Sequence, residues 1–134
     1  MKDLDWSNLG FGYRRTDYNV RCYYRDGKWG EIEVCSSEYL NIHMAATCLH
    51  YGQEAFEGLK AFRCPDGKVR VFRMDENAKR LQSTCRGIMM PEVSTELFEE
   101  MVRKVVRLNQ EYIPTYESGA SLYIRPLLIG TSAQ

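Results

Sequence analysis

The stretch LHYGQEAFEGLKAFR, residues 49–63, decides what this sequence folds into. It places two aromatic side chains, Tyr51 and Phe56, around a short polar segment, and then runs through Glu57-Gly58 into an apolar strand. A second unusual segment, SLYIRPLLIG, occupies residues 121–130 near the other end of the chain. The pattern between these two segments predicts the fold.

The composition is that of one ordinary globular domain. The 134 residues are 44% hydrophobic, which is enough for a core of its own and argues against disorder. Lys plus Arg and Asp plus Glu are balanced at 18 each, so the charge gives no case for nucleic acid or an anionic membrane as a partner. We see no signal peptide and no apolar run that could span a bilayer.

The cysteines indicate a reducing compartment. Five of them are scattered through the chain without a CxxC pair, and only two histidines accompany them, so their spacing does not match a zinc site. We therefore expect reduced thiols acting as small apolar side chains, no metal, and a cytoplasmic location.

Turn residues and apolar periodicity predict the elements. Asp26-Gly27 and Pro65-Asp66-Gly67 are hairpin turns, and Pro126 indicates an edge position or a bulge. The expected strands lie at residues 19–24, 29–34, 55–63, 69–73 and 120–130.

Two helices are expected between the second hairpin and the last strand. The first runs over residues 75–86, capped by Asp75, and the second starts at Ser94 or Thr95. The first presents one face of Ala78, Leu81, Thr84 and Cys85, and the second an apolar stripe of Leu97, Phe98, Met101, Val102, Val105 and Val106. The order ββββααβ predicts an α+β fold: an antiparallel or mixed sheet with helices packed on one side.

The chain carries no GxSxG, glycine-rich phosphate loop or HExxH motif. Its strings LHYGQEAFEGLKAF, VRVFR followed by NAKRL, and SLYIRPLLIG, in this order and spacing, nevertheless resemble the N-terminal small domain of branched-chain amino acid aminotransferases. These are pyridoxal 5′-phosphate (PLP) enzymes of fold type IV. The resemblance covers the chain from about Phe11 onward and implies this α+β small domain for residues 1–134.

The resemblance also implies a function for a parent protein. Such an enzyme, a homodimer, transfers the amino group of leucine, isoleucine or valine to 2-oxoglutarate using PLP. The family's cofactor-anchoring lysine lies in a large domain, and none of the six lysines here has a matching context. We expect no catalytic residue in this chain, which we interpret as a truncated small domain without the large one.

Arg80 is the cofactor-binding residue that the resemblance implies. In the family, the Arg of this motif contacts the PLP phosphate, and a guanidinium matches phosphate oxygens with two parallel hydrogen bonds. The alternative is an exposed helix side chain that pairs with Glu76 at i,i+4.

The remaining candidates would bind substrate. Tyr51 and Phe56 match aromatics of the family's side-chain pocket, which needs an apolar wall. Both can instead be ordinary core aromatics. Phe11 resembles a family aromatic at the rim of that pocket, on a short local motif. Tyr123 and Arg125 point to the same face of a strand. The resemblance implies that this Arg helps to place a substrate carboxylate or the loop near it. For Arg125 the alternative is a salt bridge to a nearby Asp or Glu.

Three further points stay open from the sequence. Lys60 stands where some relatives have an Arg, so it keeps the charge and loses the fork. A second hypothesis is a freestanding, non-catalytic domain that binds a ligand or a partner. A third keeps fold type IV with a different substrate, as in a D-amino acid aminotransferase or an aminodeoxychorismate lyase.

Overall fold

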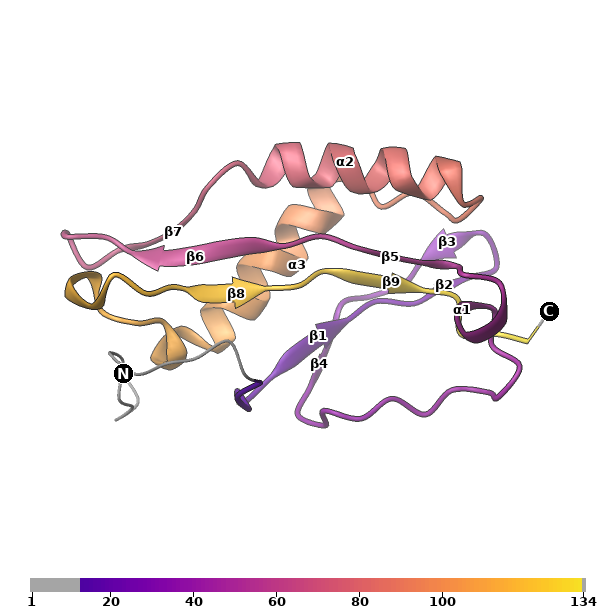
Figure 1. Cartoon of the computed structure of the whole chain (residues 1–134), viewed down its shortest axis with the longest axis horizontal. Helices are drawn as coiled ribbons and strands as arrows, with labels where there is room; N and C mark the ends of the chain where they lie inside the picture. The colour runs from indigo at the N-terminus through magenta and orange to yellow at the C-terminus, as the bar shows by residue number, and fades with distance from the viewer. Residues whose placement is uncertain (1–12, 134) are drawn as a thin grey trace.

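A computed structural model describes residues 13–133 of the chain (Figure 1). Its centre is a long antiparallel ribbon with two arms. The residues of one arm come from the middle of the sequence, and those of the other arm come from near its C-terminal end. The first arm is β5 (Glu54–Phe56) and β6 (Leu59–Arg63), and the second is β8 (Leu122–Ile124) and β9 (Leu127–Ile129). Phe56 pairs with Leu127, and Lys60 pairs with Tyr123.

Each arm of the ribbon breaks at the same level. The first breaks at Glu57-Gly58 and the second at Arg125-Pro126, and the Glu57 amide donates to the Pro126 carbonyl across the break, at 3.0 Å. Proline lacks the N–H that a strand ladder needs, so the ladder stops there. The bulge expected at Pro126 is thus a full interruption between two strands.

The second predicted hairpin is confirmed. Strand β7 (Val69–Val71) pairs with β6 on the side opposite β8, which gives the order β7-β6-β8. Gly67 in the turn has φ +82°, a conformation that favours glycine. The Asp66 carboxylate accepts from Arg70, and these hydrogen bonds lower the pKa of Asp66 below its ordinary value.

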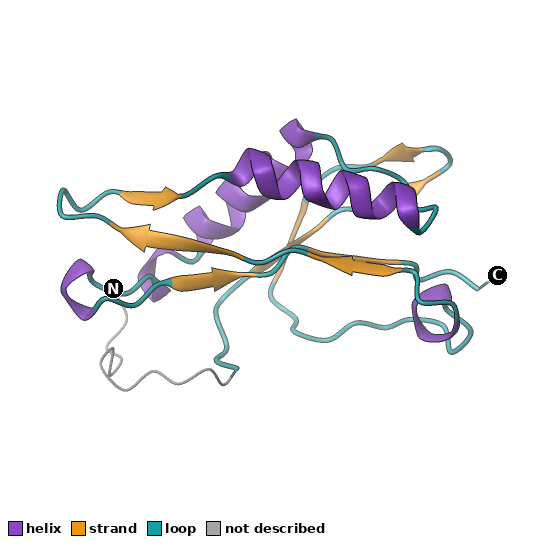
Figure 2. Ribbon diagram, turned by 45° about the horizontal axis from the view of Figure 1, so that its top comes forward, coloured by secondary structure: helices purple, strands orange, loops and turns teal. Residues whose placement is uncertain are grey.

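Two long helices cover one face of the ribbon, as the α+β prediction required. Helix α2 (Met74–Gly87) runs along it and α3 (Thr95–Leu108) crosses behind (Figures 1 and 2). Side chains from the ribbon and both helices meet in one core. It contains Ala55, Leu59, Ala61, Ala78, Leu81, Cys85, Val93, Phe98, Val102, Val106, Ile113 and Ile124.

The start of α2 differs from the prediction. Asp75 lies in the first turn and does not cap the helix; the capping position is Arg73, whose φ of 56° is left-handed and whose side chain makes no cap hydrogen bond. Thr84, placed on the buried face, is exposed, and its hydroxyl bonds back to the Arg80 carbonyl. A threonine can satisfy its hydroxyl within its own helix, so its presence did not require burial.

The start of α3 agrees with the prediction. The Ser94 hydroxyl accepts from the Leu97 amide at 3.1 Å, and Val93 and Phe98, the residues that flank the first turn, are both buried. The apolar stripe is buried most deeply at Phe98, Val102 and Val106.

The N-terminal half of the described chain forms smaller pieces than predicted. The two expected strands divide into β1 (Asn19–Arg21), β2 (Tyr24–Arg25), β3 (Lys28–Trp29) and β4 (Glu33–Cys35), paired β1–β4 and β2–β3. The turn is where the sequence indicated, with positive φ at Asp26 and Gly27. A short helix α1 (Thr47–His50) precedes β5, and short 3-10 turns η2 (Gln110–Tyr112) and η3 (Tyr116–Ser118) follow α3.

One buried amide ties the first strand to the helices. Asn109, at the end of α3, accepts from the Tyr18 amide at 3.1 Å and donates to the Tyr18 carbonyl at 2.9 Å. The Trp29 indole similarly donates to the Glu92 carbonyl. These bonds hold β1 and β3 to the elements that cover the ribbon.

The five thiols are unpaired, and burial raises the pKa of Cys85. Within residues 13–133, no helix combines the length and apolar character needed to cross a membrane.

Candidate functional site

A buried carboxylate lies at the break in the ribbon. Side chains alternate along residues 55–61, so Glu57 falls on the helix-covered face, in a row with Ala55, Leu59 and Ala61. Only 4% of Glu57 is exposed. A charge in such a place requires partners, because burial of an unpaired carboxylate is strongly unfavourable.

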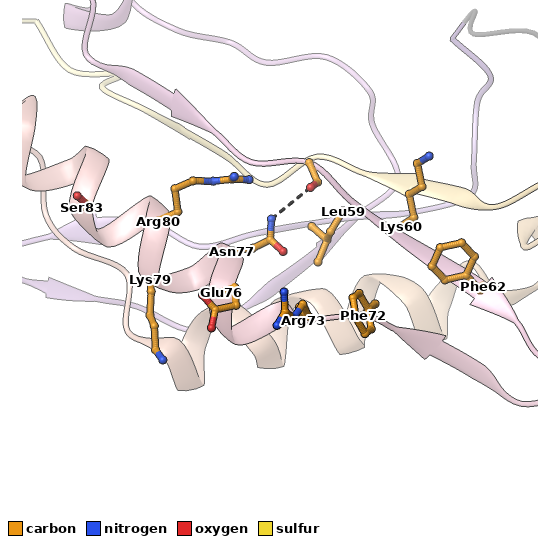
Figure 3. A pocket seen from close by; sticks show the side chains of 11 residues that line it. Leu59, Lys60, Phe62, Phe72, Arg73, Glu76, Asn77, Lys79, Arg80 and Ser83 are labelled. Carbon is orange, nitrogen blue, oxygen red and sulfur yellow. Dashed lines mark hydrogen bonds between the residues drawn. The ribbon is translucent and has the colours of Figure 1, made fainter.

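Two side chains of α2 supply these partners. Arg80 donates from Nε to both Glu57 oxygens at 3.0 Å and from Nη2 to Oε1 at 2.6 Å. Asn77, one turn earlier, donates from Nδ2 to the same oxygen at 2.9 Å and to the Gly58 carbonyl at 3.2 Å. Figure 3 shows Asn77 and Arg80 extending from α2 toward β6, with the Asn77–Gly58 bond dashed.

Arg80 is held on one edge only. A guanidinium has five N–H groups, and the bonds to Glu57 use Nε and Nη2. Nη1 has no hydrogen-bond partner within residues 13–133, and 68% of the side chain is exposed. The bonds to Glu57 also raise the pKa of Arg80. The expected alternative pair with Glu76 is therefore wrong: Arg80 pairs across 23 residues with the ribbon.

Arg80 lines an open groove of about 770 Å³ between β6 and α2. Four cationic side chains and one carboxylate border it: Lys60, Arg73, Lys79, Arg80 and Glu76 (Figure 3). This excess of positive charge favours an anion, and the outward N–H groups of Arg80 are donors of the type that phosphate oxygens accept.

The opposite face of the ribbon carries the second group of candidates. Arg125 lies over the ring of Phe56 at 4.8 Å from its centroid and over that of Tyr123 at 5.4 Å. All three side chains are exposed, so Tyr123 and Arg125 share one face as predicted. Within residues 13–133 no carboxylate forms a salt bridge with Arg125, and its position over two rings is a cation–π contact instead.

Gly58 connects the two groups. A Cβ built on Gly58 would lie 2.4 Å from the Tyr123 hydroxyl oxygen and 3.0 Å from the ring carbon that bears it. The ring of Tyr123 therefore lies against the backbone beside Glu57. The φ of Gly58 is not in the left-handed region, so another residue could adopt its backbone conformation. Glycine is needed here because a side chain would collide with the Tyr123 ring.

We expect Gly58→Ala to displace the Tyr123 ring and to lower the free energy of unfolding by about 1 kcal/mol. This is the lower limit of the usual cost of overpacking, because the ring is partly exposed and can move. Chemical denaturation and the NMR shifts of Tyr123 and Arg125 measure this. Gly87→Ala is the matched control, because nothing lies within 4 Å of its added Cβ. Adding Tyr123→Phe to Gly58→Ala removes the closest atom and restores part of the loss; equal effects of the two alanines would refute the close approach.

Tyr51 stands apart from these groups. Tyr51 is 63% exposed at the end of α1, and among the described residues its ring pairs with His50, with centroids 6.5 Å apart, and not with Phe56 or Tyr123. Phe11 lies outside the described residues. The structure thus brings together Phe56, Tyr123 and Arg125, with Arg80 on the other side of Gly58.

No role for Glu57, Gly58 or Asn77 was predicted from the sequence. Two features of the sequence could have indicated the contacts of Glu57. Glu57 is an acidic residue in a row of alternating apolar positions, and Asn77 and Arg80 are three apart on a predicted helix, hence on one face.

Comparison with solved structures defines the class of the fold. The branched-chain amino acid aminotransferase from Escherichia coli matches with a TM-score of 0.64 and 29% identity, over 89% of this chain and 35% of that one. The T.th. enzyme, complexed with N-(5′-phosphopyridoxyl)-L-glutamate, matches with a TM-score of 0.63 and 26% identity, over 89% and 35%. The fold is therefore the α+β small domain of fold type IV PLP enzymes.

Sequence comparison shows which enzymes of this fold type the chain resembles. The branched-chain-amino-acid aminotransferase of Haemophilus influenzae is 52% identical over 130 residues, which are 97% of this chain and 38% of that protein. No family model matches. The chain is related over nearly its whole length to branched-chain amino acid aminotransferases, as its motifs predicted, and it spans about 38% of the length of this relative.

Proposed function

We propose that this chain is the small-domain part of a PLP-dependent branched-chain amino acid aminotransferase, which exchanges amino groups between leucine, isoleucine or valine and 2-oxoglutarate. The similarity to the Haemophilus influenzae enzyme supports the activity. The observation that carries the chain's own role is Arg80, fixed on one edge by Glu57 and open on the other in a cationic groove.

The donor set fits the phosphate of PLP. The N–H groups of Arg80 that Glu57 does not engage point to a bidentate contact with phosphate oxygens, and Lys60 and Lys79 add positive charge along the groove. When bound, PLP supplies the electron sink for amino-group transfer, and the protein supplies orientation and electrostatics. Arg80 would hold the phosphate end in place.

The open face of the ribbon fits the substrate. Phe56 and Tyr123 present apolar rings, which is how a branched aliphatic side chain is recognised. Arg125 lies over both rings and would pair with the substrate carboxylate. The resemblance of their motifs assigns Tyr51 and Phe11 to the same substrate pocket, although the ring of Tyr51 contacts His50 and not Phe56 or Tyr123.

The wider assembly follows from the same proposal. A cofactor-anchoring lysine would come from a large domain, two copies would form a homodimer, and the enzyme would work in the cytoplasm. The named relatives do not favour a freestanding binding domain, a D-amino acid aminotransferase or an aminodeoxychorismate lyase.

In the full-length protein that carries this chain, we expect Arg80→Ala to raise the dissociation constant of PLP by roughly tenfold to a hundredfold, because a charge-assisted hydrogen bond is lost. Arg80→Lys, which keeps the charge, has a smaller effect. Titration of the apoprotein with PLP, followed by absorbance, measures both.

The control is Arg86→Ala. Arg86 is on the same helix and is also exposed and ion-paired, but with Glu92, and it does not line the groove. If Arg80→Ala binds PLP as the control does, Arg80 is not a phosphate ligand.

A further inference from the structure

Glu57 is the one buried carboxylate among residues 13–133. Its neighbours in the same row are apolar, so the sheet would pack more simply with an apolar side chain at this position. Glu57 nevertheless receives four hydrogen bonds, three of them from Arg80. This set of contacts requires a reason other than sheet stability.

The hydrogen bonds to Glu57 fix the orientation of the Arg80 guanidinium. Nε and Nη2 of Arg80 are turned to Glu57, which leaves Nη1 and the remaining N–H of Nη2 on the opposite edge of the guanidinium. Because the guanidinium is planar, fixing one edge fixes the direction in which the other edge donates. An exposed arginine without such a partner samples many rotamers, and ordering it on binding is unfavourable.

Glu57 is itself held at both ends. Its carboxylate accepts from Asn77, which also donates to the Gly58 carbonyl, and its amide donates to the Pro126 carbonyl. Glu57 is thereby tied to α2 through its carboxylate and, through its amide, to Pro126 just before β9. A rigid support of this kind transmits its position to the group that it holds.

We propose that Glu57 is a positioning residue for the phosphate group of PLP: it orients Arg80, with Asn77 as its own support, so that the free edge of the guanidinium meets the phosphate. This inference rests on the proposed role of Arg80. Glu57 touches neither the cofactor nor the substrate in this scheme, and acts through Arg80 alone.

The charge of Glu57 and its orienting contacts predict opposite changes in phosphate binding when the carboxylate is removed. A carboxylate close to an anion site repels the anion, so by charge alone its removal strengthens phosphate binding. If Glu57 acts by orientation, its removal weakens phosphate binding in spite of the added positive charge. The sign of the change therefore separates the two effects.

The experiment uses three variants of the full-length protein. Glu57→Asp keeps the charge and shortens the side chain by one methylene, which takes the carboxylate out of reach of Arg80. Glu57→Gln keeps the length and removes the charge. Glu76→Gln is the matched control, since Glu76 lines the same groove from α2, but the hydrogen bonds of Arg80 go to Glu57.

Dissociation constants are measured for PLP and for pyridoxal, which lacks the phosphate. We expect both Glu57 variants to raise the PLP constant by about tenfold and to leave the pyridoxal constant unchanged, with Glu76→Gln neutral or tighter for PLP. A general loss of structure would raise both constants together. Tighter PLP binding by Glu57→Gln, or a change shared equally by pyridoxal, overturns the proposal.

A measurement on the unmodified full-length protein does not depend on the variants folding. The Arg80 Nε–H signal in a ¹⁵N-arginine NMR spectrum is expected to stay protected from solvent exchange before and after PLP binds, because Glu57 keeps that edge. Faster exchange on PLP binding would mean that the phosphate displaces Glu57, and the proposal fails. If Arg80→Ala leaves PLP affinity unchanged, the proposed function of Arg80 fails; if that variant weakens binding and the Glu57 variants do not, only this inference fails.

Discussion

A polypeptide of these 134 residues, incubated with PLP, leucine and 2-oxoglutarate, is expected to form no glutamate above the level that PLP produces alone. Transaminases need a lysine that binds the cofactor covalently and moves a proton. None of the six lysines has a context that resembles the family's lysine segment. Lys60 and Lys79, which line the groove, are both exposed, whereas catalytic lysines are activated in desolvated surroundings.

The assay couples glutamate formation to a dehydrogenase and includes heat-denatured polypeptide as a control. Turnover by the folded polypeptide would contradict our assignment of the chemistry to residues outside this sequence. In that event, Lys60→Ala and Lys79→Ala would identify the lysine responsible.

The largest expected loss of stability comes from Phe98→Ala. Phe98 is 3% exposed in the core between the ribbon and the helices, next to Val93 at the start of α3. Removing a buried aromatic ring leaves a cavity and lowers the free energy of unfolding by about 3–5 kcal/mol. That is a large part of the roughly 5–15 kcal/mol available to a typical domain. Urea denaturation followed by circular dichroism measures it.

Phe72→Ala is the matched control, because Phe72 is the same side chain at 72% exposure. We expect a change of about 0.5 kcal/mol or less at this position. Similar losses for the two variants would mean that Phe98 is not in a closed core.

Local signals predicted the parts of this protein that depend on neighbouring residues. Asp26-Gly27 and the glycine of Pro65-Asp66-Gly67 adopt the positive φ that their turns require. Ser94 caps α3 with its own hydroxyl. Alternation placed Tyr123 and Arg125 on one face of a strand. The motif strings predicted the family for the same reason, since they are short, contiguous and readable in the sequence itself.

Local signals failed at the start of α2 and at the break in the ribbon. Asp75 has the chemistry of a cap, yet α2 starts after a left-handed Arg73, as the chain rises from β7. The expected continuous strand of residues 55–63 breaks at Glu57 because its partner breaks at Pro126, from the other end of the sequence.

The amino-acid sequence by itself determined the hairpin turns, the two long helices, the class of fold and the residue types of the candidate site. Only the tertiary structure decided that Arg80 pairs with Glu57, 23 residues away, and not with Glu76 on its own helix. It also placed Gly58 against Tyr123, on an arm of the ribbon from the other end of the chain. The physical reason is that a buried carboxylate demands a partner wherever the packing brings one, and this demand outweighs the weak attraction of an exposed i,i+4 pair.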